Sequence, residues 1–141
     1  MAHPFGGKGT KARQPFDFMV AAFRALGVSP DAILSASARE MKRLILDPLQ
    51  AMGQPFHQAP GPDGWPEAEA DWITPQGLAA RIDWAMAAPE RLVRPLPDPR
   101  DFLRTALGNR AGERLTWAVG AAESARDGVG LVLASPDFNR R

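Results

Sequence analysis

The feature that most constrains the fold of this chain is a segment rich in proline and glycine that carries two tryptophans, residues 52–72. It begins Met-Gly-Gln-Pro-Phe, continues through Gly-Trp-Pro and ends at Trp72. Prolines and glycines at this density exclude a regular helix or a central strand. The indoles of Trp65 and Trp72 are therefore held by a fold built around this loop, or they face a partner.

The composition is that of one globular domain without a nucleic-acid or membrane footprint. The 141 residues are 45% hydrophobic and 23% charged, with 17 basic against 16 acidic side chains. The two signs of charge are interspersed, so we expect no nucleic-acid partner. Apolar runs are too short for a membrane span, and no signal peptide is visible in these residues. The absence of cysteine excludes disulfides and cysteine-ligated metals.

Helix signals recur in the first third of the chain. Pro15 precedes an apolar stripe that ends before Gly27 and consists of Phe16, Met19, Val20, Phe23 and Leu26. Ser29 with Pro30 starts a second helix, whose apolar positions are Leu34, Ala38, Met41 and Ile45. Pro48 predicts a break or kink near Asp47, and a short further turn closes at Gly53.

The same signals continue after the loop. Thr74 caps a helix with Pro75 inside it, Ile73 and Leu78 form a staple, and we expect Leu78, Ile82, Ala85 and Met86 to be buried. Asp98 starts the next helix, which buries Phe102, Ala106 and Leu107 and stops at Gly108. A fifth helix carries Leu115, Ala118, Val119 and Ala122. A turn at Asp127 and Gly128 leads into a last short helix over residues 131–134, and Trp84 and Trp117 are expected on helices as rim or core residues.

These elements predict an all-α fold of about five to six helices in an irregular bundle, with the long Pro/Gly/Trp loop between the second and third main helices. Residues 1–13 are predicted to be a flexible, basic, glycine-rich arm, and residues 14–141 a single helical domain.

Residues that could carry chemistry are few. His3 and His57 lie far apart, and neither has an acid at helical spacing, so we expect no metal site and no cofactor. His57 is either a loop ligand or proton carrier, or a surface or loop-anchoring residue, and the second interpretation is favoured. Residues 6–11 lack the spacing of a phosphate-binding loop, so a flexible arm is favoured there. Ser135 before Pro136 is expected to cap a turn.

The loop itself offers the sharpest chemical hypothesis. The acids Asp63, Glu67, Glu69 and Asp71 cluster around the two indoles of the loop. This is the composition of a cleft that binds or cleaves sugars, where acids transfer protons and indole faces cover the ring. The alternative is that the acids are solvated and the indoles fold back onto the helices, and we favour this structural interpretation.

The order of the motifs resembles the C-terminal part of a large bacterial family catalogued as domain of unknown function 1800. The residues that carry the resemblance are Lys11 with Gln14-Pro15-Phe16-Asp17-Phe18, Phe23-Arg24-Ala25-Leu26-Gly27, Met52-Gly53-Gln54-Pro55-Phe56, Gly64-Trp65-Pro66, Trp72, and the closing residues 131–141. The resemblance implies a segment of a longer helical protein that is often exported from the bacterial cytoplasm, with the export signal outside these residues. It implies no reaction and no catalytic residue.

Two main hypotheses for function follow. The first is a non-catalytic helical module that packs against the rest of a longer parent protein or against a partner protein. In this hypothesis Gly53, Gly64 and Pro66 are structural residues of the loop. The second is a carbohydrate-directed enzyme or binding site, with Gln54, His57, Asp63, Trp65, Asp71 and Trp72 as ligand-binding candidates. A third hypothesis is a homodimer formed through exposed apolar faces.

Overall fold

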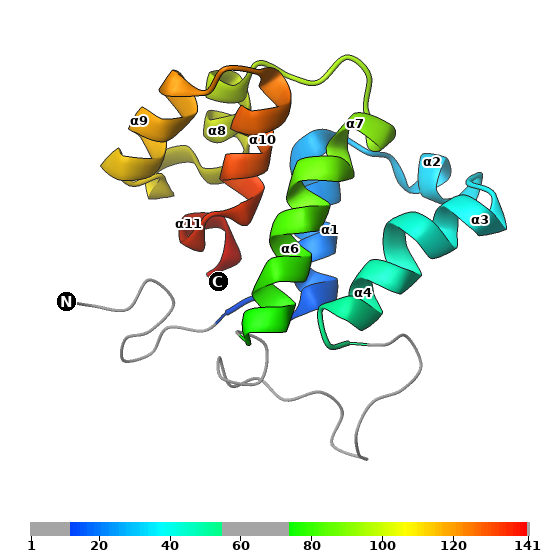
Figure 1. Cartoon of the computed structure of the whole chain (residues 1–141). Helices are drawn as coiled ribbons and strands as arrows, with labels where there is room; N and C mark the ends of the chain where they lie inside the picture. Colours follow the sequence, from blue (N-terminus) through cyan, green and yellow to red (C-terminus); the bar gives the residue numbers. More distant parts are fainter. Residues whose placement is uncertain (1–11, 55–73, 141) are drawn as a thin grey trace.

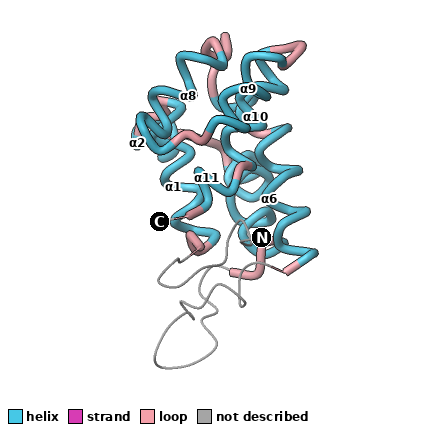
Figure 2. The backbone as a smooth tube through the Cα atoms, turned by 90° about the vertical axis from the view of Figure 1, so that its left-hand side faces the viewer, coloured by secondary structure: helices cyan, strands magenta, loops and turns pink. Residues whose placement is uncertain are grey.

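The computed structural model describes residues 12–54 and 74–140, and in these residues the fold is all-α. Figure 2 shows helices and loops in these ranges and no strand. One isolated antiparallel bridge joins Ala12 to Arg140. The helices are α1 (Pro15–Leu26), α2 (Pro30–Leu34), α3 (Ala38–Met41), α4 (Asp47–Ala51), α6 (Pro75–Ala87), α7 (Pro89–Leu92), α8 (Pro99–Leu107), α9 (Glu113–Ala121), α10 (Ala125–Ala134) and α11 (Pro136–Asn139). A π-helical segment, Lys42–Leu46, joins α3 to α4, and a 3-10 turn, Gly108–Arg110, follows α8.

The described ranges contain more helical segments than the five to six predicted, because several expected helices are divided into shorter ones. Proline stands at the first or second position of α2, α4, α7 and α11. Proline fixes a backbone angle compatible with a helix start but cannot donate the backbone hydrogen bond of a helix interior. The prolines of α2, α7 and α11 therefore mark new short helices, whereas at α4 the helical path continues from the preceding segment.

The long helix α6 lies in the middle of the molecule. It packs against α10 on one side and against α4 on the other, while α10 also contacts α8 and α9 (Figure 1). Behind α6, α1 contributes an aromatic core in which Phe18 meets Trp84 and Phe138 edge to face, with ring centroids 5.5 and 5.9 Å apart. Such aromatic pairs add to the free energy of burial alone.

The contact between α10 and its neighbours depends on two glycines. A Cβ atom at Gly128 would overlap the ring of Pro99, and one at Gly130 would overlap the side chain of Met86. The predicted turn at Asp127 and Gly128 is therefore wrong. Both residues lie inside α10, which begins at the N-cap Ser124, whose Oγ accepts a hydrogen bond from the Asp127 N–H at 3.0 Å. The glycines allow close helix packing instead of a turn.

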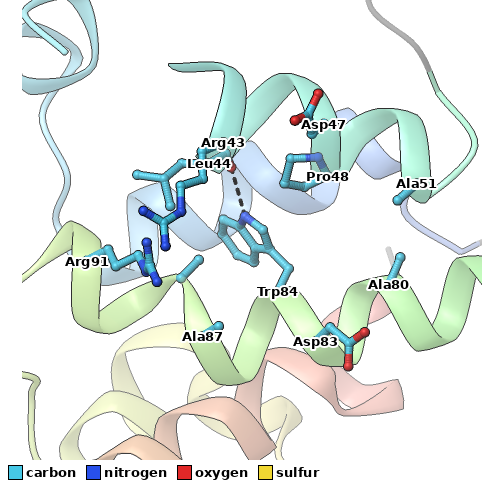
Figure 3. A pocket seen from close by; sticks show the side chains of 11 residues that line it. Arg43, Leu44, Asp47, Pro48, Ala51, Ala80, Asp83, Trp84, Ala87 and Arg91 are labelled. Atoms are coloured by element: carbon cyan, nitrogen blue, oxygen red, sulfur yellow. Dashed lines mark hydrogen bonds between the residues drawn. The ribbon is translucent and has the colours of Figure 1, made fainter. Parts of the chain in front are cut away.

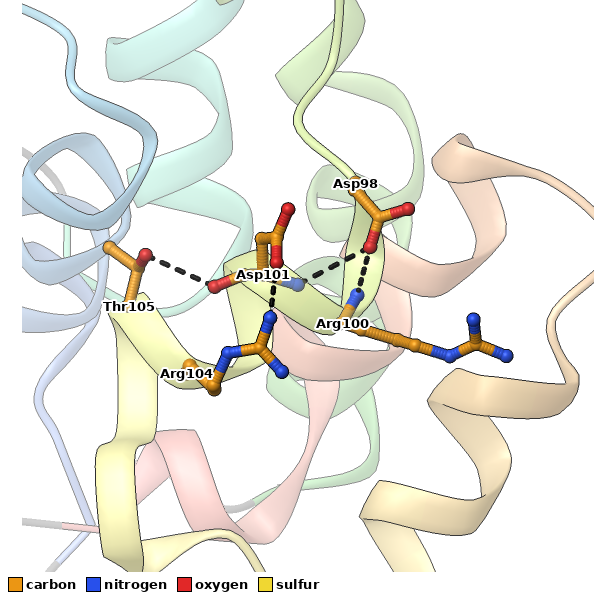
Figure 4. A network of polar contacts seen from close by, with 5 residues as sticks. All are labelled: Asp98, Arg100, Asp101, Arg104 and Thr105. Atoms are coloured by element: carbon orange, nitrogen blue, oxygen red, sulfur yellow. Dashed lines mark hydrogen bonds and ion pairs between the residues drawn. The ribbon is translucent and has the colours of Figure 1, made fainter.

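The helix starts that the capping residues predict agree with the structure. The Thr74 side chain accepts a bond from the Gly77 N–H at 3.0 Å, and Ser135 accepts one from the Phe138 N–H at 3.1 Å. Asp98 Oδ1 accepts bonds from the backbone N–H groups of Arg100 and Asp101 at the start of α8 (Figure 4). The same exposed turn holds an ion pair between Arg104 and Asp101. The Ile73 staple predicted beside Thr74 lies outside the described residues.

Four apolar residues predicted to face the core are exposed: Phe16, Leu34, Ala38 and Ile82. The exposed fractions are 46% for Phe16, 80% for Leu34 and 45% for Ile82. In α6 the buried face instead consists of Gly77, Arg81, Trp84 and Ala85. The prediction for Ile82 was wrong because α6 is turned to bury an arginine, which hydrophobic periodicity does not score as a core residue.

The sequence predicts a break or kink near Asp47, but the chain does not break at Pro48; it changes its helical pitch just before it. A proline ring clashes with the carbonyl of the residue four positions earlier, which here is Leu44, and it has no N–H to donate to that carbonyl. The chain stays helical through this point by widening into the π-helical segment Lys42–Leu46. The carbonyl of Leu44 is thereby left for another donor.

Candidate functional site

Only two of the residues predicted for the loop site lie in the described part of the chain, Gly53 and Gln54. The others, His57, Asp63, Gly64, Trp65, Pro66, Asp71 and Trp72, lie outside the described residues. Gly53 has a φ of 102°, which only glycine adopts without strain, and it ends α4. The N–H of Gln54 donates to the carbonyl of Leu49 at 2.9 Å, which completes this helix stop.

Gln54 is buried and tied to the start of α1. Its Oε1 accepts a hydrogen bond from the backbone N–H of Phe16 at 2.8 Å, and its Nε2 donates to Oε1 of Gln14 at 3.3 Å. The N–H of Phe16 belongs to the first turn of a helix, where backbone donors have no partner within the helix. Gln54 therefore joins the end of α4 to the start of α1, and both polar atoms of its amide are engaged.

Next to this contact lies a buried polar cluster, which we call the Arg81 clasp and define as Arg13, Arg81, Phe138 and Asn139. Arg81 is only 1% exposed. Its Nη1 donates to Oδ1 of Asn139 at 2.9 Å, and its Nη2 donates to the carbonyl of Arg13 at 2.7 Å. The backbone N–H of Arg13 donates to the carbonyl of Asn139 at 2.7 Å. The clasp thus ties α6 to both ends of the described chain.

The second half of the clasp orders the segment after α10. The Nδ2 of Asn139 donates to the carbonyls of Leu133 and Ser135, at 2.9 and 2.8 Å. The Nε of Arg13 donates to the carbonyl of Phe138 at 2.8 Å, and its guanidinium lies 5.4 Å from the centre of the Phe138 ring. Asn139 is consequently a hub that connects Arg81 with two backbone carbonyls.

Arg81 keeps its charge in an apolar setting. Burial lowers the pKa of Arg81 to about 10, because the interior solvates the cation poorly. Its guanidinium lies 5.4 Å from the centre of the Phe18 ring, and its Nε is buried without a hydrogen-bond partner. No carboxylate in the described part of the chain pairs with it. The arrangement fits a positioning role for the chain ends, since carbonyl oxygens and an aromatic face stabilise the cation.

A separate pocket lies between α4 and α6, on the opposite side of α6 from α10. It has a volume of about 390 Å³. Its walls are Arg43, Leu44, Asp47, Pro48, Ala51, Ala80, Asp83, Trp84, Ala87, Ala88 and Arg91. Two of these alanines, Ala80 and Ala87, come from α6, and Ala88 is the residue that follows it; the indole of Trp84 lies among these small side chains (Figure 3). The volume lies in the range of ligand pockets.

The indole of Trp84 is held in this pocket by a hydrogen bond to the carbonyl that Pro48 leaves without a helical donor. Its Nε1 donates to the carbonyl of Leu44 at 2.9 Å (Figure 3). This is the carbonyl that Pro48 deprives of its ordinary helical donor. The proline, the π-helical segment and the tryptophan therefore form one unit, which holds the indole as a rigid wall of the pocket. Single π-helical turns are frequent at functional sites.

The positive and negative charges around this pocket lie at different places along its length. Figure 3 shows the side chains of Arg43 and Arg91 extending toward one another at the end near α7, while Asp47 and Asp83 lie farther along α4 and α6. Neither Arg43 nor Arg91 forms an ion pair or a hydrogen bond through its side chain with a residue that the structure describes. A bound group that meets both guanidinium groups is expected to carry negative charge.

Sequence reasoning missed both the clasp and the pocket. An arginine in a helix gives no sign of burial, because the partners of Arg81 come from residues 58 and 68 positions away. The sequence predicts a kink near Pro48 and a rim or core position for Trp84, but it gives no link between the two residues. The usable signal was the carbonyl four residues before Pro48, which must find a donor outside its own helix.

The comparisons with known proteins fit the motifs in the sequence. The family model described as Protein of unknown function (DUF1800) matches residues 1–140. This match spans nearly the whole sequence, so the chain belongs to that family. No curated protein and no solved structure matches the chain.

Proposed function

We propose that this member of the DUF1800 family is a non-catalytic helical module that binds a segment of protein, from the rest of a longer parent protein or from a partner, in the pocket between α4 and α6. The observation that carries the proposal is the fixed indole of Trp84, which walls an apolar pocket with two arginines at one end whose side chains pair with no residue in the described ranges. Pockets with a rigid aromatic wall and a few polar groups at the edge are typical binding sites.

The family motif residues that the structure describes support the non-catalytic part of the proposal. Gly53 ends a helix, Gln54 joins α4 to α1, and Gln14 accepts a hydrogen bond from Gln54. Each of these contacts serves the fold. The described part of the motif therefore has a structural role, since it joins α4 to α1. The pocket is a separate surface, which is available for recognition.

Position 87 gives a direct test of the pocket. Ala87 is exposed and lines the pocket, whereas Ala79 is exposed on the same helix and does not line it. A photo-crosslinking amino acid is introduced at each position in the full-length protein in its native cell, and crosslinked peptides are identified by mass spectrometry. We expect one recurring protein segment at position 87 and none at position 79. Equal crosslinking at both positions, or none at position 87, would contradict the proposal.

Two alternatives remain predictions. A carbohydrate site in the loop between Trp65 and Trp72 falls on residues outside the described ranges, and a shift of tryptophan fluorescence across a panel of polysaccharides tests it. A homodimer is the second, and two exposed side chains, Leu34 at 80% and Trp117 at 75%, are candidates for its contacts. The mass in solution at several concentrations tests the dimer. No helix in residues 12–54 and 74–140 has the length and apolar character needed to cross a membrane.

A further inference from the structure

A second cavity borders the pocket at Trp84, beside α7. This cavity has a volume of about 640 Å³ and shares Ala87 and Arg91 with the first pocket. Its other lining residues are Glu90, Val93, Arg94, Leu96 and Arg126. The two hollows meet at Ala87 and Arg91, and we call them together the groove; it is apolar at Trp84 and basic beyond Arg91. An extended ligand anchored at Trp84 would pass over Arg91 and reach Arg94 and Arg126.

Two of the arginines in the second cavity each donate a hydrogen bond to a backbone carbonyl. The Nε of Arg94 donates to the carbonyl of Glu90 at 3.0 Å, and the Nε of Arg126 donates to the carbonyl of Met86 at 2.8 Å. These bonds use one nitrogen of each guanidinium. The terminal nitrogens of Arg94 and Arg126 make no hydrogen bond with another residue in the described ranges. Orienting an arginine in advance reduces the entropy lost when an anion binds.

The sign of the charge changes along the groove, from negative beside α4 and the middle of α6 to positive over α7. Arg43, Arg91, Arg94 and Arg126 lie at the Trp84 pocket's α7 end and beyond it, and Glu90 is the single carboxylate among the residues that line this part. Glu90 Oε1 lies 3.4 Å from Nε of Arg126, so it offsets one of the four positive charges. Asp47 and Asp83 lie along the other part of the pocket. A negatively charged ligand is thereby favoured over α7 and disfavoured beside the two aspartates.

The geometry points to an acidic peptide segment of a partner protein as the occupant of this groove, with one apolar side chain against Trp84 and carboxylates over Arg91, Arg94 and Arg126. This inference rests on the proposed function and adds the chemistry and direction of the ligand. Charge complementarity selects the segment: carboxylate groups form charge-assisted, bidentate bonds with arginine. The apolar pocket supplies the anchor, and the aspartates at the other end exclude a segment that is acidic throughout.

The test uses the whole chain and three labelled synthetic peptides, each prepared in both sequence directions. The first has the order Gly-Gly-Leu-Phe-Gly-Glu-Glu-Glu, the second replaces the glutamates with glutamines, and the third replaces Leu-Phe with Ser-Ser. Fluorescence anisotropy is measured up to about 1 mM peptide, where even weak complexes are populated. We expect one direction of the first peptide to bind at least about tenfold more tightly than the third, because its anchor is buried.

Protein variants separate the two parts of the groove. Ala51→Leu fills the Trp84 pocket from the exposed end of α4, and Ala79→Leu is its control outside the groove. The double variant Arg91→Gln/Arg94→Gln removes charge from the second cavity, and Arg114→Gln on α9 is the control for one exposed charge lost elsewhere. We expect the Ala51→Leu variant to bind the first peptide no more tightly than the third, which lacks the Leu-Phe anchor. We expect the double variant to weaken the acidic peptide about threefold or more at low salt and to leave the glutamine peptide unchanged.

The outcomes divide clearly. If the anchor matters but glutamates and glutamines bind alike, the acidic ligand is wrong and the groove still docks protein. If no peptide shows a dependence on Ala51→Leu or on the arginines, this inference falls, and the crosslinking at position 87 decides the proposed function independently. Tighter binding to vesicles of anionic lipid than to any peptide, lost in the double variant, would overturn the inference in favour of a membrane surface.

Discussion

Replacing Arg81 with methionine tests whether the hydrogen bonds of the clasp stabilise the fold by more than the buried charge destabilises it. Methionine has a similar length and no charge, so the substitution removes the cation while keeping much of the volume. The two effects oppose each other. The structure supplies a magnitude for each, and their difference gives the sign of the change in the free energy of unfolding.

The cost of burial follows from the pKa. A pKa of about 10 for Arg81 corresponds to about 3 kcal/mol for keeping this cation in the interior, which methionine would recover. Against this, two hydrogen bonds from a charged donor are lost, each contributing about 1.5–3 kcal/mol, and the Asn139 side-chain oxygen is left buried without this partner. The contact with Phe18 adds about 1–2 kcal/mol more. We expect Arg81→Met to destabilise the chain by about 1–5 kcal/mol.

Arg81→Lys is the matched variant, because it keeps the charge and loses the planar fork. Lysine cannot reach the Asn139 and Arg13 acceptors with two fixed nitrogens, so we expect it to destabilise the chain by about 2 kcal/mol as well. Stabilities are measured by guanidinium unfolding followed by circular dichroism, with Asn139→Ala included to complete a double-mutant cycle with Arg81→Met. A coupling energy of about 1 kcal/mol or more is expected between these two positions.

Two results would refute this reasoning. If Arg81→Met were as stable as the parent or more stable, the hydrogen bonds of the clasp would not outweigh the cost of burial. If Arg81→Lys matched the parent, the charge alone would matter and the fork geometry would not. Either outcome would also remove the argument that Asn139 is held in place by Arg81.

The remaining predictions concern packing and the proline unit, and guanidinium unfolding checks each of them. Gly128→Ala is expected to destabilise the chain by about 1–3 kcal/mol through overlap with the rigid ring of Pro99. Gly120→Ala, whose Cβ would have open space apart from the Arg100 side chain at 3.8 Å, is expected to stabilise α9 by up to about 1 kcal/mol, and equal effects at both glycines would contradict the packing argument. Trp84→Phe should cost about 1–2 kcal/mol by removing the donor to the Leu44 carbonyl. That cost should shrink in a Pro48→Ala background, where residue 48 supplies its own N–H, and an unchanged cost would show that the proline does not create the need for the indole.

Local signals in the sequence predicted the helix starts well. Thr74, Asp98 and Ser135 cap helices because their side-chain oxygens meet backbone donors only a few residues away. Gly27 and Gly53 end helices with positive φ, which is also a local property. Such contacts depend on neighbours in sequence, so the sequence is enough to find them.

Features that depend on distant residues were missed. Leu34 and Ile82 continue helical stripes, yet they are exposed because the core is completed by other faces. Gly128 resembles a turn residue until Pro99 is placed beside it, and Arg81 resembles a surface residue until both chain ends close over it. The Trp84 pocket needs the relative placement of α4 and α6, which no local pattern encodes. The loop residues proposed for sugar binding lie outside the described ranges and stay a prediction.

The pairing of Ala12 with Arg140 also determines how the molecule responds to mechanical load. Residues 12 and 140 lie opposite one another, and residue 13 bonds to residue 139 one step further in. We expect tension applied outward at these two points to separate residues 12 and 140, and then residues 13 and 139, because these pairs lie nearest to the points of load. Loss of the Arg13 contacts would expose the Arg81 cation to water.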